Sequence, residues 1–330
     1  MDWNTILITT VKAAIGLETV VYALAAIGIN IHFGYAGLLN FGQAAFLAVA
    51  AYGLAVTVAT FHLSFWLGIA IGLVGSVLLA FLLGIPTLRL RADYLAIVTI
   101  AAAEIVRLIL RSVKFSGIFG GSDGRQHFSA DFFAMNPYPD GQYGIFAITF
   151  NERVLWVITV GWVLVLLSCL LVYMLMKSPW GRVLKAIRED EDAVRSLGKN
   201  VFSYKMQALV LGGLIGCLGG FIFALGQASV QPDLFSTEFT FYAFTIVILG
   251  GAARVFSPVV GAAIFWVLLV FIGNTLSEAV AAGIIPEWLM SVNQVGAVRF
   301  MLVGLGLMLL LIFRPQGIFG DKREIALDAR

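Results

Sequence analysis

A long stretch without formal charge limits what this chain can fold into. Between Glu18 and Arg89 there is no Asp, Glu, Lys or Arg. About 20 apolar residues cross the hydrocarbon core of a bilayer as a helix, and irregular backbone is too costly there because its polar groups find no water. We therefore expect several membrane crossings in this stretch. Four further uncharged runs continue the pattern: 154–176, 206–232, 239–253 and 255–277.

The composition excludes a water-soluble protein. Hydrophobic residues make up 60% of the chain and charged residues 12%, whereas soluble domains are roughly 45–50% apolar and about 25% charged. The net charge of +2 is small and the basic residues are clustered, so there is no footprint for nucleic acid. The sequence predicts a single domain over residues 1–330, an all-α polytopic transmembrane helical bundle.

We predict nine spanning helices, within a range of eight to ten. The run 239–252 is short for a full crossing and ends at Gly250-Gly251, so we expect a broken or re-entrant helix there. The closely spaced glycines of the sixth run predict close helix packing through small faces. The predicted spans are 17–31, 38–60, 65–84, 93–113, 154–176, 206–227, 239–252, 258–277 and 297–313.

Lys and Arg are concentrated in alternate loops, and cytoplasmic loops carry the excess of these residues. The segment from Lys177 to Lys205 contains seven of them, whereas 228–238 and 278–296 contain none. We therefore place the first segment in the cytoplasm and the other two outside.

The same alternation orients the remaining connections. Arg89, Arg91 and the tail 314–330 fall in the cytoplasm, while the N-terminus and the polar connection 114–153 fall outside. The connection 114–153 is too irregular for a span. It is either a contact surface for an external partner or a solvated connector.

The sequence lacks the motifs of an ATPase. A phosphate-binding loop ends in Gly-Lys-Ser/Thr, but Gly198-Lys199 is followed by Asn200 and Ala193 stands at the position of the first glycine. Zinc-protease and nucleophile-elbow patterns are missing as well. We expect no catalytic residue, no metal site and no cofactor of the chain's own.

The cytoplasmic loop 178–204 has the pattern of an amphipathic helix. Basic and acidic residues alternate with apolar ones, and Gly198 closes the pattern. A helix lying along the inner surface can dock into a groove of a partner. The alternative is a basic loop that sets the topology and touches lipid headgroups.

Six segments in the same order resemble the permease family of branched-chain amino acid ABC importers. They sample nearly the whole chain, and the resemblance is closer to the longer of that family's two permease subunits. The segments are GYAGLLNFGQAAFLAVAAY (34–52), LRLRADYLAIVTIAAAEIVRLI (88–109), GGSDG (120–124), SPWGRVLKAIREDEDAVRSLG (178–198), ILGGAARVFSPVVGAAIF (248–265) and FRPQGIFG (313–320).

This resemblance implies a multi-pass permease subunit of the bacterial inner membrane. Its implied partners are a second, similar permease, two cytosolic ATPases that bind the ATP, an extracytoplasmic substrate-binding protein and membrane lipid. The loop 178–204 corresponds to the coupling loop of such permeases. Its candidate ATPase-coupling residues are Gly181, Arg182, Lys185, Ala186, Arg188, Glu189, Glu191, Ala193 and Gly198.

The resemblance leaves the substrate open, because urea and short-chain amide importers share these segments. Two departures from the pattern bear on the pathway: Asn40 stands where the family often has Ser, and Ala92 where it often has Gly. An ion-coupled secondary transporter is the further alternative, but such proteins usually carry acidic or histidine relays in several spans, and only Glu104 is a good candidate here.

Polar groups inside apolar spans are candidates for the substrate path, because they are expensive in hydrocarbon. Asn30, Asn40 and Gln43 gather at the first two spans, and a regular helix would put the last two on one face. They either line a polar path or make hydrogen bonds between helices.

Glu104 and Arg107 lie three residues apart, which favours a structural ion pair over a gate. The ends of discontinuous helices can meet the charges of a zwitterion. The glycine-rich breaks at Gly34 to Gly37 and at Gly250 and Gly251 are the predicted positions for such ends.

Overall fold

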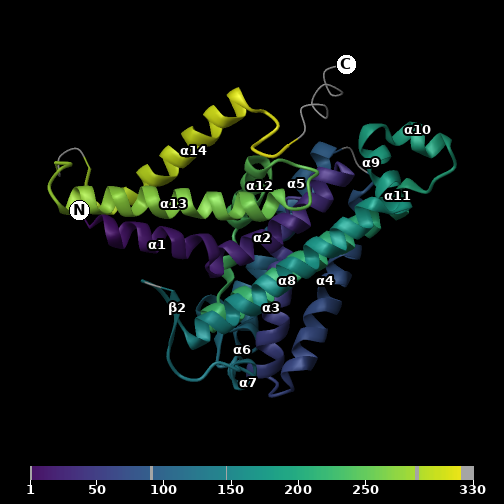
Figure 1. The fold of residues 1–330 in the computed structure, drawn as a ribbon. Helices are drawn as coiled ribbons and strands as arrows, with labels where there is room; N and C mark the ends of the chain where they lie inside the picture. The colour runs from purple at the N-terminus through teal and green to yellow at the C-terminus, as the bar shows by residue number, and fades with distance from the viewer. Residues whose placement is uncertain (1, 90–91, 146, 287–289, 321–330) are drawn as a thin grey trace.

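The computed structural model describes residues 2–89, 92–145, 147–286 and 290–320 and is a bundle of helices (Figure 1). Arg91 and the tail from residue 321 lie outside the described residues. The main helices are α1 (Trp3–Ile15), α2 (Leu17–Ile29), α3 (Gln43–Ala59), α4 (Phe65–Thr87), α5 (Ala92–Arg111), α8 (Glu152–Lys177), α9 (Pro179–Glu189), α10 (Glu191–Ser196), α11 (Val201–Gln227), α12 (Thr237–Gly250), α13 (Ser257–Ala281) and α14 (Val295–Phe313).

Short elements fill the connections, most of them between α5 and α8. They include two small antiparallel sheets that the sequence did not predict, one pairing β1 with β4 and one pairing β2 with β3. The elements are η1 (a π-helical turn, Asn30–Tyr35), η2 (Val113–Phe115), α6 (Ser116–Phe119), η3 (Gly121–Asp123), β1 (Arg125–Gln126), α7 (Ala130–Ala134), β2 (Gln142–Ile145), β3 (Ile148–Asn151), β4 (Ser229–Val230), η4 (Pro232–Phe235) and η5 (Val292–Gln294).

All nine predicted runs are helical, but they differ in length and polarity. Over the described part of the chain, six helical segments are long and apolar enough to cross a membrane. Helices α3 and α12 are shorter, with 17 and 14 residues, and the 20-residue α5 carries several charges.

Two predicted boundaries are wrong. The second span was expected from residue 38, but residues 37–42 are not helical and α3 begins at Gln43. The first span was expected from residue 17, but α1 precedes it, and both belong to one segment from Trp3 to Tyr35. Asp2, Lys12 and Glu18 interrupt the apolar pattern and hid this helix.

Glycines of α11 allow the closest packing in the core. A methyl group on Gly212 would lie 2.5 Å from the Gly28 carbonyl oxygen, and one on Gly220 would lie 2.3 Å from the Leu47 carbonyl oxygen. Side chains at either position would therefore push α11 away from α2 or α3. The prediction of close packing at this glycine-rich span is confirmed.

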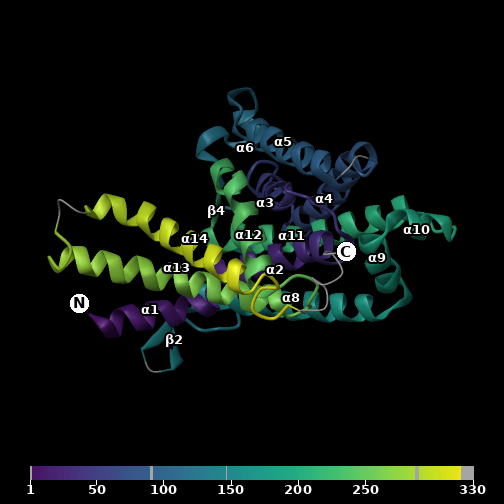
Figure 2. The ribbon, with the colours of Figure 1, turned by 90° about the horizontal axis from the view of Figure 1, so that it is seen from above.

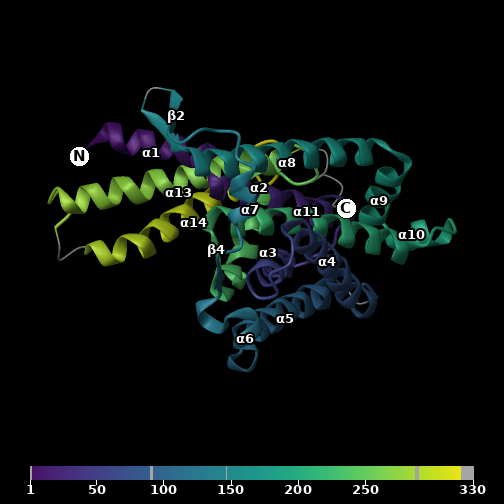
Figure 3. The same ribbon diagram turned by 90° about the horizontal axis from the view of Figure 1, so that it is seen from below.

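The connection that contains α9 and α10 and the connection between α5 and α8 lie at different ends of the molecule. In Figures 1 and 3, α9 and α10 project from one end, whereas α6 and β2 lie away from that end. One contact brings η1 to the α9 end: Arg188 of α9 donates to the Gly34 carbonyl oxygen.

Candidate translocation and coupling site

The chain leaves helical geometry between α2 and α3, deep inside the bundle. The π-helical turn η1 ends at Tyr35, and residues 37–42 are not helical. Irregular backbone at membrane depth is tolerated only where protein or a water-filled cavity surrounds it. Leu38, Asn40 and Gly42 are buried, so protein covers most of this segment. We call η1 together with this segment, residues 30–42, the first break.

Side chains from two helices and from the break itself accept hydrogen bonds from backbone amides of the first break and the start of α3. The amide of Phe41 donates to Thr99 Oγ1 of α5 at 3.0 Å, and the amide of Ala44 donates to Thr240 Oγ1 of α12 at 3.0 Å. The amide of Gly42 donates to Asn40 Oδ1 at 2.9 Å. Thr99 and Thr240 are fully buried and were not singled out from the sequence.

His32 joins the first break to α11. Asn40 Nδ2 lies 3.1 Å from His32 Nδ1, and His32 Nε2 lies 3.1 Å from the Leu209 carbonyl oxygen. The amide nitrogen is a donor and the carbonyl an acceptor, so Nδ1 accepts and Nε2–H donates, which is the neutral form of the ring. A lone histidine in an apolar run gave no sequence signal for this role.

Asn40 and Gln43 do not share a helix face, contrary to the expectation for a regular helix. Asn40 lies in the first break, and Gln43 is the first residue of α3. Gln43 Nε2 donates to the Gly212 carbonyl oxygen at 3.2 Å, and both side chains are fully buried. Both side-chain amide nitrogens thus bond to other groups of the bundle, while the buried Oε1 of Gln43 has no hydrogen-bond partner among the described residues.

Asn30 ties the first break to a second one, the turn 251–256 that follows α12. Its Oδ1 accepts from the amide of Ala253 at 2.9 Å, and its Nδ2 donates to the Arg254 carbonyl at 2.8 Å. Gly34 permits this contact, because a methyl group there would lie 2.2 Å from Asn30 Oδ1.

The second break begins at the glycine pair Gly250-Gly251 that the sequence identified. Gly250 ends α12, and Gly251 has a φ of 105°, a conformation that favours glycine. The amides of Ile318 and Phe319 donate to the carbonyls of Leu249 and Gly250 at 2.9 and 3.0 Å. The end of this short helix is therefore covered by the segment that follows α14.

The predicted coupling loop, residues 178–204, contains two short helices, α9 and α10, rather than the single amphipathic helix that the sequence predicted. Asp190 has extended backbone between α9 and α10, and its side chain accepts from the amides of Asp192 and Ala193 as an N-cap. Gly198 has a φ of 77° after α10. The chain thus turns at Asp190, and α10 projects beyond α9 (Figure 2).

One face of this loop is buried and the other is open. Gly181, Leu184 and Ile187 of α9 are buried, and a methyl group on Gly181 would lie 2.5 Å from the Met176 Cα. Glu191 is held by Arg195 at 2.8 Å. The exposed candidate coupling residues are Arg182, Lys185, Ala186, Glu189, Ala193 and Gly198.

Arg188 connects α9 directly to the first break. Its Nη1 donates to the Gly34 carbonyl oxygen at 2.5 Å. Lys185 Nζ lies 5.6 Å from the centre of the Tyr35 ring, within the range of a cation–π contact. Two cations of one helix face therefore hold the end of the π-helical turn.

Glu104 and Arg107 form the predicted ion pair, at 2.6 Å. The structure adds Asp233 of η4, which Arg107 contacts at 2.5 Å and Arg111 at 3.2 Å. The Glu104 side chain is 37% exposed. These charges join α5 to the connection before α12.

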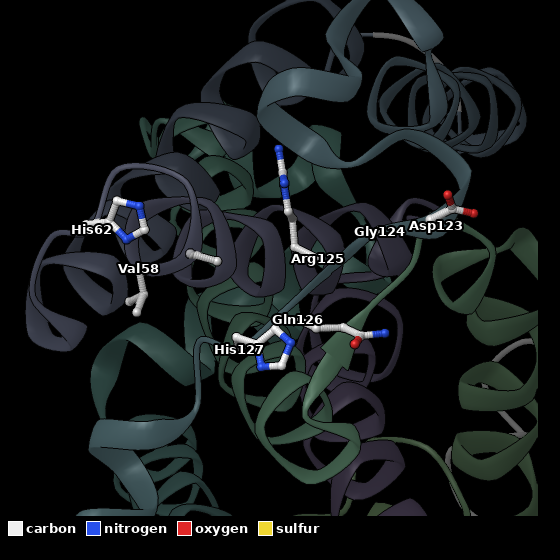
Figure 4. A pocket seen from close by; sticks show the side chains of 8 residues that line it. Val58, His62, Asp123, Gly124, Arg125, Gln126 and His127 are labelled. Carbon is white, nitrogen blue, oxygen red and sulfur yellow. The ribbon is translucent and has the colours of Figure 1, made fainter.

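A pocket of about 410 Å³ lies at the end opposite to α9. It is lined by His62, Asp123 and His127 and contains part of the GGSDG segment. Figure 4 shows that the two imidazoles and the carboxylate of Asp123 do not converge on one point. No metal-binding group of three or more side chains was found in the described ranges.

Replacing Asn30 tests the tie between the two breaks. We predict that Asn30→Ala lowers the thermal stability of the purified protein, because the buried Ala253 amide loses its acceptor, at a cost of about 1–3 kcal/mol. Asn4→Ala, on the exposed side of α1, is the matched control. Equal melting temperatures for both variants in detergent would contradict the proposed tie.

A family model and a sequence relative point to the same family. Residues 13–313 match the family model of the branched-chain amino acid transport system permease component. The chain is 32% identical to the high-affinity branched-chain amino acid transport system permease protein LivM of Salmonella typhimurium, over 94% of this chain and 70% of that one.

Two further comparisons give lower identities, one with a relative by sequence and one with a solved structure. The probable branched-chain amino acid transport permease protein LivM of Methanocaldococcus jannaschii is 28% identical, over 91% of both chains. PsaBC from Streptococcus pneumoniae in complex with Fab has a TM-score of 0.45 and 14% identity, covering 97% of this chain and 95% of that one. At that TM-score the likeness decides nothing about the fold.

Proposed function

Because the chain belongs to the family of branched-chain amino acid transport permease components, we propose that it conducts branched-chain amino acids into the cell. It is a multi-pass membrane protein and the permease component of an ATP-binding-cassette importer, not an enzyme itself. Such a permease works with ATPase subunits and a substrate-binding protein. Family membership also removes the ground for an ion-coupled secondary transporter.

We propose that α9 and α10 dock the ATPases in the cytoplasm. The support is their projection from the bundle and the open face that carries Arg182, Lys185, Ala186 and Glu189. A second, similar permease completes the pore, and the binding protein delivers substrate at the opposite end, near the pocket at Asp123.

We propose that movement of α9 reaches the substrate path through Arg188. Its guanidinium holds the Gly34 carbonyl, and Asn30 in the same turn holds the second break. A displacement of α9 therefore acts on both interrupted helices at once. The ends of interrupted helices can meet the charged groups of a zwitterionic substrate without side-chain charge.

An aromatic cluster beside the first break supports an apolar substrate. Phe41 stacks on Phe244 with ring centres 4.3 Å apart and lies 5.5 Å from Phe241, whose side chain is half exposed. Burying a Val, Leu or Ile side chain stabilises by about 1.5–3 kcal/mol. Urea has no apolar group that gains from such a surface.

Removing the Arg188 side-chain donor tests the coupling step. We predict that Arg188→Met leaves the ATPases bound but lowers substrate uptake per ATP hydrolysed about tenfold, since a hydrogen bond from a charged group contributes about 1.5–3 kcal/mol. Arg195→Met is the matched control, because Arg195 pairs only within α10 among the described residues. Unchanged uptake per ATP in the Arg188 variant would remove Arg188 from the mechanism.

Uptake by the complete transporter tests the substrate class. In liposomes that hold both permeases, the ATPases and the binding protein, we predict ATP-dependent leucine uptake that isoleucine and valine inhibit and that urea and acetamide do not. Phe241→Ala should reduce leucine uptake, with Phe313→Ala at the exposed end of α14 as control. Uptake of urea in preference to leucine would replace the proposed substrate.

A further inference from the structure

Two cavities adjoin near α9: the walls of the first come from α4, α8, α9 and α11, and those of the second from the residues after α4, from α10 and from the start of α11. The first is an apolar groove of about 870 Å³, with Phe81, Leu175 and Leu211 among its walls. The second is a polar cavity of about 840 Å³ that contains Arg89 and Lys199. The two are adjacent, because Asn200 and Phe202 line both.

The groove has the length of one membrane leaflet. It follows α11 from Asn200 to Leu211, which is about 16 Å at 1.5 Å per residue. Half of a hydrocarbon core about 30 Å thick is about 15 Å. Its polar end carries Trp180, whose Nε1 donates to Gln207 Oε1 at 2.8 Å, and an indole at that level is typical of the membrane interface.

The polar cavity has an excess of positive charge. Its acidic groups are already paired: Glu191 with Arg195 and Lys205, and Asp192 with Arg195 at 3.0 Å. Arg89 and Lys199 make no ion pair with any residue that the structure describes.

Arg89 sits where the two cavities meet. Its guanidinium lies 5.7 Å from the centre of the Phe202 ring, a residue that lines both. In a cation–π contact the aromatic ring covers only the flat face of the guanidinium. The N–H groups at the edge of the Arg89 guanidinium are therefore available to an anion.

We propose that this site binds an anionic phospholipid, with its phosphate between Arg89 and Lys199 and one acyl chain in the groove beside Phe81 and Leu211. A leaflet-long apolar groove that ends at unpaired cations fits this ligand class. An amphipathic peptide of the ATPase would leave the membrane-embedded part of the groove empty. The inference depends on the proposed function only for assigning the lipid to the cytoplasmic leaflet.

Lipid retention by the purified complete transporter tests the proposal. Native mass spectrometry in the presence of phosphatidylglycerol should show bound lipid, and Arg89→Gln or Lys199→Gln should each weaken retention about fivefold. Lys114→Gln and Lys177→Gln remove exposed cations outside the site and serve as controls. Millimolar inorganic phosphate should not displace the lipid, because phosphate cannot fill the groove.

A photoreactive residue at Phe81 identifies the occupant of the groove. A crosslink to phospholipid supports the proposal, whereas a crosslink to an ATPase or to another permease overturns it. Equal lipid retention in the site and control variants also overturns it. These readouts do not depend on leucine uptake, so their failure leaves the proposed transport function untouched.

Discussion

Broken helices inside a membrane need partners for every freed backbone group, and this requirement organises the protein. Thr99 and Thr240 supply acceptors from α5 and α12, and Asn40 caps the turn itself. These contacts fix where α5 and α12 lie relative to α3. Thr99, Thr240 and Asn40 therefore act as partners for interrupted backbone, since the alternative in hydrocarbon is an unsatisfied amide.

The same requirement links the first break to α9. A helix that ends inside the bundle exposes carbonyls, and Arg188 of α9 takes the one at Gly34. Asn30, in the same turn as Gly34, accepts a hydrogen bond from the amide of Ala253 in the second break. Mechanical coupling in this account is a chain of hydrogen bonds between the ends of three helices, and glycines allow the close approach at each of them.

Sequence reasoning predicted the helices and the two glycine-rich breaks because uncharged runs and Gly-Gly pairs are local signals. The Glu104–Arg107 pair was also local and is confirmed. It missed His32, Thr99 and Asp233, whose partners are far away in the chain and whose residue types are common in other roles. It placed Asn40 in a helix because an apolar run gives no sign of the hydrogen bonds from distant residues that satisfy the backbone of a break.

The central claim is that α9 and α10 lie in the cytoplasm, where they receive the ATPases. Labelling of Ala186→Cys with a membrane-impermeant maleimide tests it most directly, since the native Cys169 and Cys217 are buried. Asp140→Cys, exposed in the opposite connection, reports the other side. The account predicts that Ala186→Cys reacts only in inside-out vesicles and Asp140→Cys only from outside; labelling of Ala186→Cys in sealed, right-side-out cells would contradict it.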